Sequence, residues 1–428
     1  MIDTREPPER AFLVGLDLPR ARFEAEDSLN ELASLVEAAG GVVAGRTMQG
    51  RRAPDPHTWV GKGKAGELAQ EAGRVGAEII VTDDELTPTQ QRGLEGVTNR
   101  RVVDRSAVIL DIFARHARTK EGRVQVELAQ LQYQMPRLRG IWKGLSRLGG
   151  GIGTRGPGES LLETDRRVIE RRLLDLKARL AEVQKQRERS RSSRRREGLF
   201  LAALVGYTNV GKSTLLNLLA GADVFVADQP FATLDPTTRR MAMPGGGAIL
   251  LSDTVGFVNK LPPTLVAAFR ATLEELDDAD LLVHVADAGH PNLHERLVVV
   301  KETLRSLGLA DRPTLVVFNK ADMLRGAEGD ALREALAGEF PGAVLTSART
   351  GTGLDLLRDR LREQGVARWK RVKVTLPFSD GALVQRVRER GALRAADYSE
   401  RGIEIDADVP ADLAQDLLSR KLVSSARR

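Results

Sequence analysis

Short apolar runs alternate with stretches of helical spacing along the N-terminal part of the chain. The apolar runs predict strands, because each is only a few residues long and carries no helical repeat. Between them, apolar side chains recur every three or four residues, as on the buried face of an amphipathic helix. Strands that alternate with helices favour a parallel sheet, so we expect a small α/β unit over residues 1–118. The expected strands are Ala11–Gly15, Gly41–Ala44 and Ile79–Val81, and the helical faces are Leu29, Leu32, Leu35 and Val36, then Leu68 to Val75.

Residues 119–197 carry longer helical repeats and no strand pattern. A first repeat stops before Pro136, which predicts a short helix that ends there. A second repeat recurs at seven-residue intervals, as in a helix packed along a partner. We therefore predict an antiparallel helical hairpin with a short first helix, a long second helix and a connector over residues 137–158. The two series are Val124, Leu128, Leu131 and Met135, and then Leu162, Ile169, Leu176 and Val183 with Leu173 and Leu180.

Residues 198–366 again alternate strands with helices. These strands are apolar without a break, which suits the interior of a parallel sheet covered on both faces. Residues 367–428 predict a small α/β appendage. The expected fold class is therefore multidomain α/β, with a parallel sheet in the central domain. The expected elements are strands Leu201–Val205, Ala248–Leu251, Leu281–Ala286, Thr314–Phe318, Ala343–Leu345 and Val372–Leu376, and helices Gly381–Arg390 and Ala411–Arg420.

Composition narrows the class of protein. The chain has no cysteine, which excludes disulfides, thiolate zinc sites and thiol catalysis and is compatible with a reducing compartment. Its first ten residues are charged and contain proline, unlike a signal segment, and no apolar run approaches the roughly 18 residues that span a bilayer. We expect a soluble, cytoplasmic protein.

Positive charge is concentrated in two segments. The net charge is +6, from 65 basic and 59 acidic residues, which is a small excess if spread evenly. Residues 135–158 instead hold five basic side chains and no acid, and residues 187–196 hold six arginines against one glutamate. Such local positive fields favour a polyanion such as nucleic acid. The alternative is a flexible basic linker, an interpretation that suits the second segment better than the first.

The first basic segment is also rich in glycine and contains one tryptophan. A connector of this length is unusual inside a compact domain unless it is functional or disordered. Held out on two helices, it is typical of a probe for an RNA surface, where cations meet phosphates and an aromatic ring stacks on bases. A disordered loop with no partner is the alternative. The candidate RNA contacts are Arg137, Arg139, Trp142, Lys143, Arg147 and Arg155.

A phosphate-binding loop follows the first strand of the central domain. Its glycines let successive backbone N–H groups point at phosphates, and the following helix adds the positive end of its dipole. Lys212 places a charge at the β- and γ-phosphates, and Ser213 is positioned to bind Mg²⁺. Strand, loop and helix occur in the required order, which separates the motif from a chance match. The loop is Gly206, Tyr207, Thr208, Asn209, Val210, Gly211, Lys212 and Ser213, and Thr214 continues into the helix.

Three further elements of a guanine-nucleotide site come in order along the chain. The first follows a buried strand and supplies Asp253 behind the metal and the Gly256 N–H for the γ-phosphate. In the next, the Asp322 carboxylate can accept from N1–H and N2–H of guanine, whereas adenine lacks matching donors, so it selects GTP. In the last, the Ala348 N–H is expected to donate to guanine O6. The residues are Asp253, Thr254, Val255 and Gly256; Asn319, Lys320, Ala321 and Asp322; and Ser347, Ala348 and Arg349.

Residues 231–237 are predicted to sense the nucleotide. Thr233 is our choice for the residue that closes on Mg²⁺ and the γ-phosphate, with Thr237 and Thr238 as alternatives. The nucleotide contacts in this segment are Phe231, Ala232 and Thr233, the catalytic residues are Lys212, Thr233 and Gly256, and the metal ligands are Ser213 and Thr233.

Phe257 stands where Ras-like GTPases carry a glutamine that orients the attacking water. A phenyl ring cannot position water by hydrogen bonding. Either Phe257 is a core residue without catalytic bearing, or the site is incomplete. Both interpretations predict slow hydrolysis until another group orients the water.

We assign no function to two other motifs. Residues 61–64 (Gly-Lys-Gly-Lys) lack the first glycine and the final Ser or Thr of a phosphate loop, so we expect a surface turn. The acidic run Asp83, Asp84 and Glu85 is expected to be a solvated strand end, not an acid–base pair.

Four segments resemble the HflX family of translational GTPases, and with the nucleotide motifs they cover nearly the whole chain. The glycine-rich segment beside the helical hairpin is the most specific. The segments are Thr58 to Lys64 (TWVGKGK), Gly150 to Glu159 (GGIGTRGPGE), Glu163 to Arg167, in which Asp165 and Arg166 also match, and Phe231 to Thr237 (FATLDPT).

The resemblance implies an N-terminal α/β unit with a helical hairpin, a G domain and a small C-terminal domain. It implies binding to the large ribosomal subunit, GTP hydrolysis stimulated by the ribosome, and dissociation of stalled ribosomes under stress. In such proteins the hairpin tip, here residues 137–158, approaches the peptidyl-transferase region. Members also hydrolyse ATP through the N-terminal domain, in which we find no ATP loop.

Two other hypotheses stay open: a GTP-dependent factor in ribosome assembly or RNA modification, and a signalling GTPase whose hairpin docks a protein partner. A phosphate-contacting protein loses affinity steeply with salt, which separates the signalling hypothesis from the other two. We expect mainly a monomer with Mg²⁺ as its cofactor.

Overall fold

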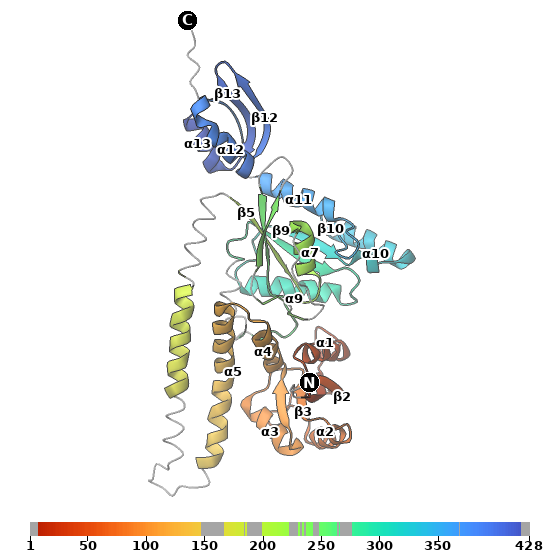
Figure 1. Cartoon of the computed structure of the whole chain (residues 1–428). Helices are drawn as coiled ribbons and strands as arrows, with labels where there is room; N and C mark the ends of the chain where they lie inside the picture. Colours follow the sequence, from red (N-terminus) through yellow and green to blue (C-terminus); the bar gives the residue numbers. More distant parts are fainter. Residues whose placement is uncertain are drawn as a thin grey trace, which may run out of the picture. The chain divides into compact units, whose positions relative to one another are not determined.

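The structure is a computed structural model of the chain (Figure 1), and it describes residues 7–146, 167–183, 185, 199–221, 230–231, 233–234, 237–242, 248–262, 265, 276–367 and 369–420. Contacts between residues divide the chain into two compact units. Unit 1 comprises residues 1–183, 227–235 and 258–271, and unit 2 comprises residues 184–226, 236–257 and 272–428. Two segments from the G-domain part of the sequence therefore group with the N-terminal residues.

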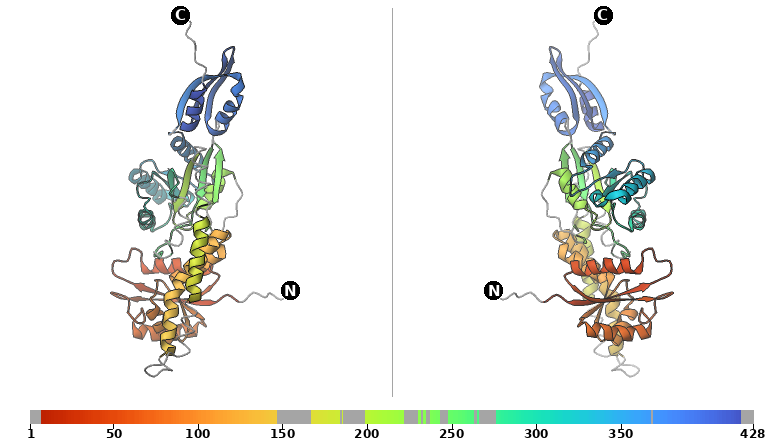
Figure 2. Two further views of the ribbon diagram at one scale, coloured as in Figure 1. Left: turned by 90° about the vertical axis from the view of Figure 1, so that its left-hand side faces the viewer. Right: turned by 90° about the vertical axis from the view of Figure 1, so that its right-hand side faces the viewer.

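Unit 1 contains a four-stranded parallel sheet between two layers of helices. Its elements are β1 (Arg10–Asp17), α1 (Ala25–Ala38), β2 (Val42–Gly50), α2 (Lys62–Arg74), β3 (Ile79–Thr82), α3 (Pro88–Thr98), β4 (Arg101–Asp104) and α4 (Arg105–His116). The strand order is β2-β1-β3-β4. Helices α1 and α4 lie on one face and α2 and α3 on the other, as Figure 2 shows. Because both faces are covered, β1 is buried except at its ends.

Two predictions in unit 1 need correction. Strand β4 was missed because only Val102 and Val103 are apolar in it, too short a run to recognise. The surface turn predicted at residues 61–64 is wrong, since Gly61 is the N-cap of α2 and Lys62 begins that helix.

A helical hairpin follows the sheet of unit 1. Helix α5 (Lys120–Ser146) runs beside a second helix over residues 167–183 (Figures 1 and 2), as predicted. Leu176 is fully buried, and Arg172 donates to both carboxylate oxygens of Glu127 on α5 at 2.7 and 3.0 Å.

The predicted end of the first helix is wrong, because α5 continues through Pro136 to Ser146. A proline inside a helix costs about 3 kcal/mol because it removes one hydrogen bond and crowds the preceding turn. Arg137, the next residue, donates to Asp104, to the Leu86 carbonyl and, on α5 itself, to the Tyr133 carbonyl. These tertiary contacts hold the turn after the proline in helical form.

Unit 2 contains a six-stranded sheet with the order β10-β9-β8-β5-β7-β6. Its elements are β5 (Phe200–Gly206), α7 (Lys212–Ala220), β6 (Thr237–Ala242), β7 (Ala248–Asp253), β8 (Leu281–Asp287), α9 (Leu293–Ser306), β9 (Thr314–Asn319), η1 (Ala321–Met323), α10 (Gly326–Glu339), β10 (Val344–Leu345) and α11 (Leu354–Val366). All five predicted strands of this sheet are present. The unpredicted strand, β6, is a mostly polar edge strand that pairs antiparallel to β7, so it shows no apolar run.

The last part of unit 2 is a three-stranded antiparallel sheet with the order β11-β13-β12. Its elements are β11 (Lys370–Leu376), η2 (Phe378–Asp380), α12 (Gly381–Arg390), β12 (Ala392–Ser399), β13 (Gly402–Val409) and α13 (Ala411–Ser419). Alternate residues of β11 and β13 are buried in one core with residues of α12 and α13. The predicted α/β fold class is confirmed in both units.

Candidate functional site

The phosphate-binding loop joins the C-terminal end of β5 to the start of α7. Gly206 has a φ of 152°, and a Cβ atom there would lie 2.1 Å from the Val285 carbonyl oxygen. Gly211 has a φ of 91°, and a Cβ atom there would lie 2.4 Å from Nδ2 of Asn319. Both the backbone angle and the available space therefore require glycine at these two positions.

Lys212 lies at the first turn of α7 and reaches back over the loop. It is 7% exposed, and its ammonium donates to the carbonyl oxygens of Gly206 and Tyr207 at 3.3 and 2.9 Å. Burial lowers the pKa of Lys212 to about 8, while the nearby Asp253 carboxylate acts in the opposite direction. The ammonium of Lys212 is therefore mostly charged at neutral pH and begins to lose its proton near pH 8.

We expect nucleotide affinity to fall as the pH rises through 8. Phosphates stabilise the ammonium, so the pKa of Lys212 is higher in the bound state than in the free state, and affinity is lost above the free-state pKa. Affinity for GDP, measured by titration calorimetry, should be about fourfold weaker at pH 8.5 than at pH 7. Lys212→Arg is the matched control, because its guanidinium stays charged and its affinity should stay constant. A constant affinity in the unmodified chain would contradict the assignment.

The hydroxyl of Ser213, a predicted Mg²⁺ ligand, and the carboxylate of Asp253, expected behind the metal, meet beside this loop. Ser213 Oγ donates a hydrogen bond to Asp253 Oδ2 at 2.5 Å. Thr254, the residue after Asp253, donates through Oγ1 to the Leu204 carbonyl at 2.7 Å. A hydroxyl and a carboxylate fit Mg²⁺, which takes few ligands from protein and the rest from phosphates and water. No group of three or more His, Cys, Asp or Glu side chains that could hold a metal occurs within the described ranges.

The backbone of Phe257 pairs with the phosphate loop. The Thr208 N–H donates to the Phe257 carbonyl at 2.7 Å, and the Phe257 N–H donates to the Gly206 carbonyl at 3.0 Å. A Cβ atom on Gly256 would lie 2.8 Å from Thr208 Cα and 3.0 Å from the Lys212 ammonium nitrogen, so Gly256 directly borders the loop. The Phe257 ring is 2% exposed and has no polar atom. It is a core residue that leaves the water-orienting position without a hydrogen-bonding side chain.

The base-recognition residues converge at the ends of β9 and β10. Asn319 Nδ2 donates to the Val210 carbonyl at 2.8 Å, and Asn319 Oδ1 accepts from the Ala348 N–H at 2.9 Å. Asp322 accepts from Ser347 Oγ at 2.6 Å and pairs with Arg349 Nε at 3.1 Å.

These contacts orient the carboxylate that is expected to read guanine. The Ser347 hydroxyl is the main cause of the lowered pKa of Asp322, with a smaller effect from Arg349. Lys320 lies beside them and pairs with Asp287 at 2.9 Å. Asp322 is therefore ionised at neutral pH, the state that accepts two hydrogen bonds.

The nucleotide-sensing segment is described only in part. Phe231 has a φ of 58°, and its ring lies edge-on to Phe113 of α4 with ring centroids 4.7 Å apart. Its side chain is thus part of the unit 1 core, so the predicted contact of Phe231 with nucleotide would have to be made by its backbone. Ala232 lies outside the described residues. Thr233 belongs to unit 1 and Ser213 to unit 2, so their joint binding of Mg²⁺ stays a prediction.

Lys260, three residues after Phe257, forms an ion-pair cluster that the sequence did not reveal. Its ammonium lies 2.5 Å from Asp83 Oδ2 and 2.6 Å from Asp84 Oδ1, at the end of β3. Asp83 is 2% exposed and is also bound by Arg105 at 2.7 Å and by the Ser28 hydroxyl at 2.6 Å. The expectation that Asp83 is a solvated strand end is therefore wrong. No local pattern identifies such a cluster, because Lys260 and Asp83 lie 177 residues apart.

We expect Lys260→Ala to raise the rate of GTP hydrolysis by the isolated protein. The ion pairs fix the segment that follows the Asp253–Gly256 motif, and their loss gives that segment and the adjoining motif more freedom to change conformation. Lys260→Arg, which keeps the charge, is the control and should hydrolyse GTP at the rate of the unmodified chain. Asp83 keeps Arg105 as a partner, so unit 1 should stay folded. An unchanged rate in a folded Lys260→Ala protein would refute this coupling.

Arg137 is used inside unit 1 and is removed from the predicted RNA contacts. Its guanidinium is 15% exposed, bonds to Asp104 at 2.8 Å, and stacks 3.4 Å from the centroid of the Tyr133 ring. Arg139, Trp142 and Lys143 lie on the last turns of α5, where only the backbone is described. Arg147 and Arg155 lie outside the described residues.

The fold and the site define the class of protein. The sheet is mostly parallel, with a phosphate loop after β5, a D-x-x-G motif after β7 and an oriented Asp322 beyond β9. These features define a guanine-nucleotide-binding P-loop domain. None of the described helices is both long and apolar enough to cross a membrane.

Comparisons with known proteins identify the family. Residues 26–114, 116–194 and 201–320 match the families described as GTP-binding GTPase N-terminal, GTP-binding GTPase Middle Region and 50S ribosome-binding GTPase. The chain is 45% identical to GTPase HflX of Lacrimispora saccharolytica, over 96% of both chains. It is 43% identical to GTPase HflX of Escherichia coli, over 94% of this chain and 93% of the relative. The chain belongs to the HflX family of GTPases, and it hydrolyses GTP.

A solved structure is also similar. A GTP-binding protein of Sulfolobus solfataricus, determined in complex with GDP, is 25% identical and superposes with a TM-score of 0.42. The match covers 84% of this chain and 99% of that chain.

Proposed function

We propose that this GTPase binds the large ribosomal subunit, which stimulates its GTP hydrolysis, and that it thereby dissociates stalled ribosomes under stress. The observation that carries the proposal is a guanine-nucleotide site whose water-orienting position is filled by the buried ring of Phe257. Such a site depends on a group from elsewhere for fast hydrolysis. The 50S ribosome-binding GTPase match and the HflX relatives support the ribosome as the source of that group.

The residues of the site have distinct roles in this proposal. The loop amides and Lys212 stabilise the phosphate charge, Gly256 donates its N–H to the γ-phosphate, and Asp322 selects guanine. Ser213 and Thr233 would hold Mg²⁺, which when bound neutralises charge on the β- and γ-phosphates. All of these groups bind the nucleotide or Mg²⁺, and none of them orients the attacking water. Hydrolysis therefore still requires another group that positions this water.

The basic segment between the two hairpin helices would contact ribosomal RNA. Residues 138–158 hold four basic side chains and no acid, and the first part of this segment forms the last turns of α5 (Figure 1). Cations there would meet phosphates, and Trp142 would stack on an exposed base. The remaining RNA-contact candidates are Arg139, Trp142, Lys143, Arg147 and Arg155. Action on ribosomes implies a cytoplasmic location, and we propose a monomer.

Light scattering of intact ribosomes tests this function. With GTP the protein should lower the scattering as subunits separate, and with GDP it should not. A tip variant in which Arg139, Lys143, Arg147 and Arg155 are changed to Ala should lose this effect while still binding GTP. The matched control changes Arg191, Arg194, Arg195 and Arg196 of the second basic segment to Ala, which removes the same charge.

Each outcome of that experiment is informative. Equal loss of dissociation in the tip variant and the control would overturn the assignment of the tip. Binding to large subunits without dissociation would favour the assembly or RNA-modification factor. Failure to bind large subunits at any nucleotide state would reject the ribosomal function altogether.

A further inference from the structure

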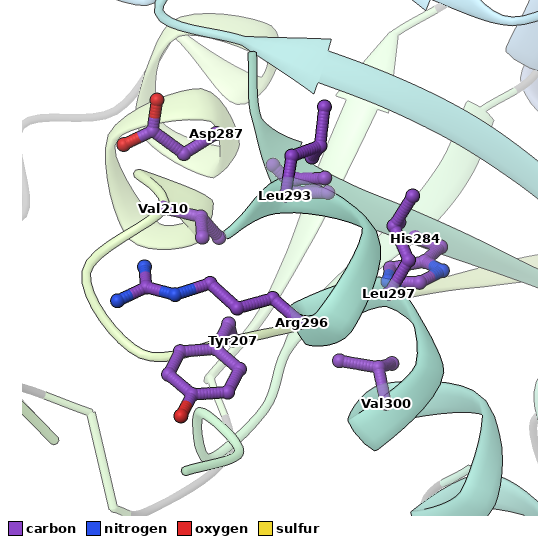
Figure 3. Close-up of a pocket in the computed structure, with 10 residues that line it drawn as sticks. Tyr207, Val210, His284, Asp287, Leu293, Arg296, Leu297 and Val300 are labelled. Atoms are coloured by element: carbon purple, nitrogen blue, oxygen red, sulfur yellow. The ribbon is translucent and has the colours of Figure 1, made fainter. Parts of the chain in front are cut away.

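The outer side of the phosphate loop faces helix α9. Tyr207, the second residue of the loop, is 2% exposed, and the Arg296 guanidinium of α9 lies over its ring with Cζ 4.4 Å from the centroid (Figure 3). Among the described residues, the buried Nε of Arg296 has no hydrogen-bond partner, and no ion pair joins Arg296 to another side chain. Within the described part of the chain, the Arg296 guanidinium therefore makes its one specific contact, a cation–π interaction, with the ring of Tyr207.

The surroundings of Tyr207 make this contact important for its position. A cavity of about 10 Å³ lies behind the loop, between Tyr207, Val210 and the apolar side chains of α9 (Figure 3). This space is about the size of one water molecule, so side chains do not fill the back of the loop completely. Because packing behind the loop is incomplete, the contact with Arg296 contributes to fixing the position of the ring.

The backbone of Tyr207 in turn holds the catalytic cation. Its carbonyl oxygen accepts from the Lys212 ammonium at 2.9 Å, the shorter of the two contacts that this ammonium makes with the loop. A shift of Tyr207 would therefore displace the acceptor that places Lys212 over the phosphates.

We propose that Arg296 is a positioning residue for nucleotide binding, which acts on Lys212 through the ring and backbone of Tyr207. The cation–π contact is stronger than on an exposed surface because the ring is buried and the guanidinium is partly desolvated. This inference rests on GTP binding alone, so it can succeed or fail independently of the ribosomal function.

Nucleotide-binding measurements on the full chain test the proposal. Arg296→Met keeps the length and removes the charge, and it should weaken GDP and GTP binding about threefold to tenfold. Arg296→Lys, which keeps a cation over the ring, should restore part of that loss. In steady-state hydrolysis, KM should rise with Kd while kcat changes by less than about twofold, because Arg296 does not touch the reacting atoms. Arg305→Met, an exposed site on the same helix, is the matched control and should bind normally.

A double-mutant cycle shows whether Arg296 acts through Tyr207. In a Tyr207→Leu background, Arg296→Met should cause little further loss, because the ring on which it acts is gone. Thermal unfolding of each variant checks that the domain stays folded. Two outcomes would overturn the proposal: losses that simply multiply in the double variant, or an Arg296→Met protein that binds nucleotide as tightly as Arg305→Met does.

Discussion

Asp322→Asn should reduce the affinity for GTP and GDP at least about a hundredfold, while creating affinity for xanthine nucleotides. An asparagine replaces one of the two carboxylate acceptors with a donor, so guanine N1–H and N2–H can no longer both be bound. Xanthine has a carbonyl oxygen in place of the 2-amino group, and that oxygen would accept from the new amide. The loss is large because a buried polar group left unpaired costs more than a weakened hydrogen bond.

Competition binding with GTP, XTP and ATP measures this change of specificity. The control is Asp355→Asn, the same substitution at a carboxylate that is 96% exposed, because an exposed ion pair contributes little. Its affinity for GTP should stay within about threefold of that of the unmodified chain. Retention of GTP binding by Asp322→Asn, with no gain for XTP, would mean that another residue reads the base.

Gly211→Ala should abolish measurable nucleotide binding, a loss of roughly a hundredfold or more. The new Cβ atom would lie 2.4 Å from Nδ2 of Asn319, the atom that donates to the Val210 carbonyl. One methyl group would therefore disturb the phosphate loop and the base pocket together. The positive φ of 91° adds strain of order 1–3 kcal/mol.

Gly221→Ala separates strain from steric conflict. Gly221 caps the C-terminus of α7 with a φ of 62°, and a Cβ atom there meets nothing within 4 Å. This variant should lose stability in thermal unfolding but bind nucleotide at saturating concentration. If Gly211→Ala and Gly221→Ala bound nucleotide equally well, the close approach of Gly211 to Asn319 would not matter for function.

The nucleotide site could be read from the sequence because each motif directly follows a strand. The four motifs begin at or just after the C-terminal ends of β5, β7, β9 and β10, with Gly206, Asp253, Asn319 and Ser347 respectively. Because these strands run parallel, their C-terminal ends lie at the same edge of the sheet. The order of motifs thus predicted their convergence. The helical hairpin was predictable from its apolar repeat, in which Leu176 is buried and Ile169, Leu173, Leu180 and Val183 are half-buried.

The features that escaped prediction depend on partners distant in sequence. Asp83 looked like part of a solvated acidic run, yet it is buried because Arg105 and Lys260 neutralise it. Arg137 looked like a free cation of a basic tip, yet Asp104 and the Tyr133 ring hold it inside unit 1. A window of sequence shows charge and spacing, but it does not show which charges a fold will pair.

The central claim is that GTP hydrolysis by this chain is slow until the protein binds the large ribosomal subunit. The most direct measurement is the rate of phosphate release at saturating GTP, with the full chain alone and with isolated large subunits added. We predict slow release by the chain alone and an increase of at least about tenfold with large subunits, because they supply what Phe257 cannot. An equal rate with and without large subunits would contradict the account.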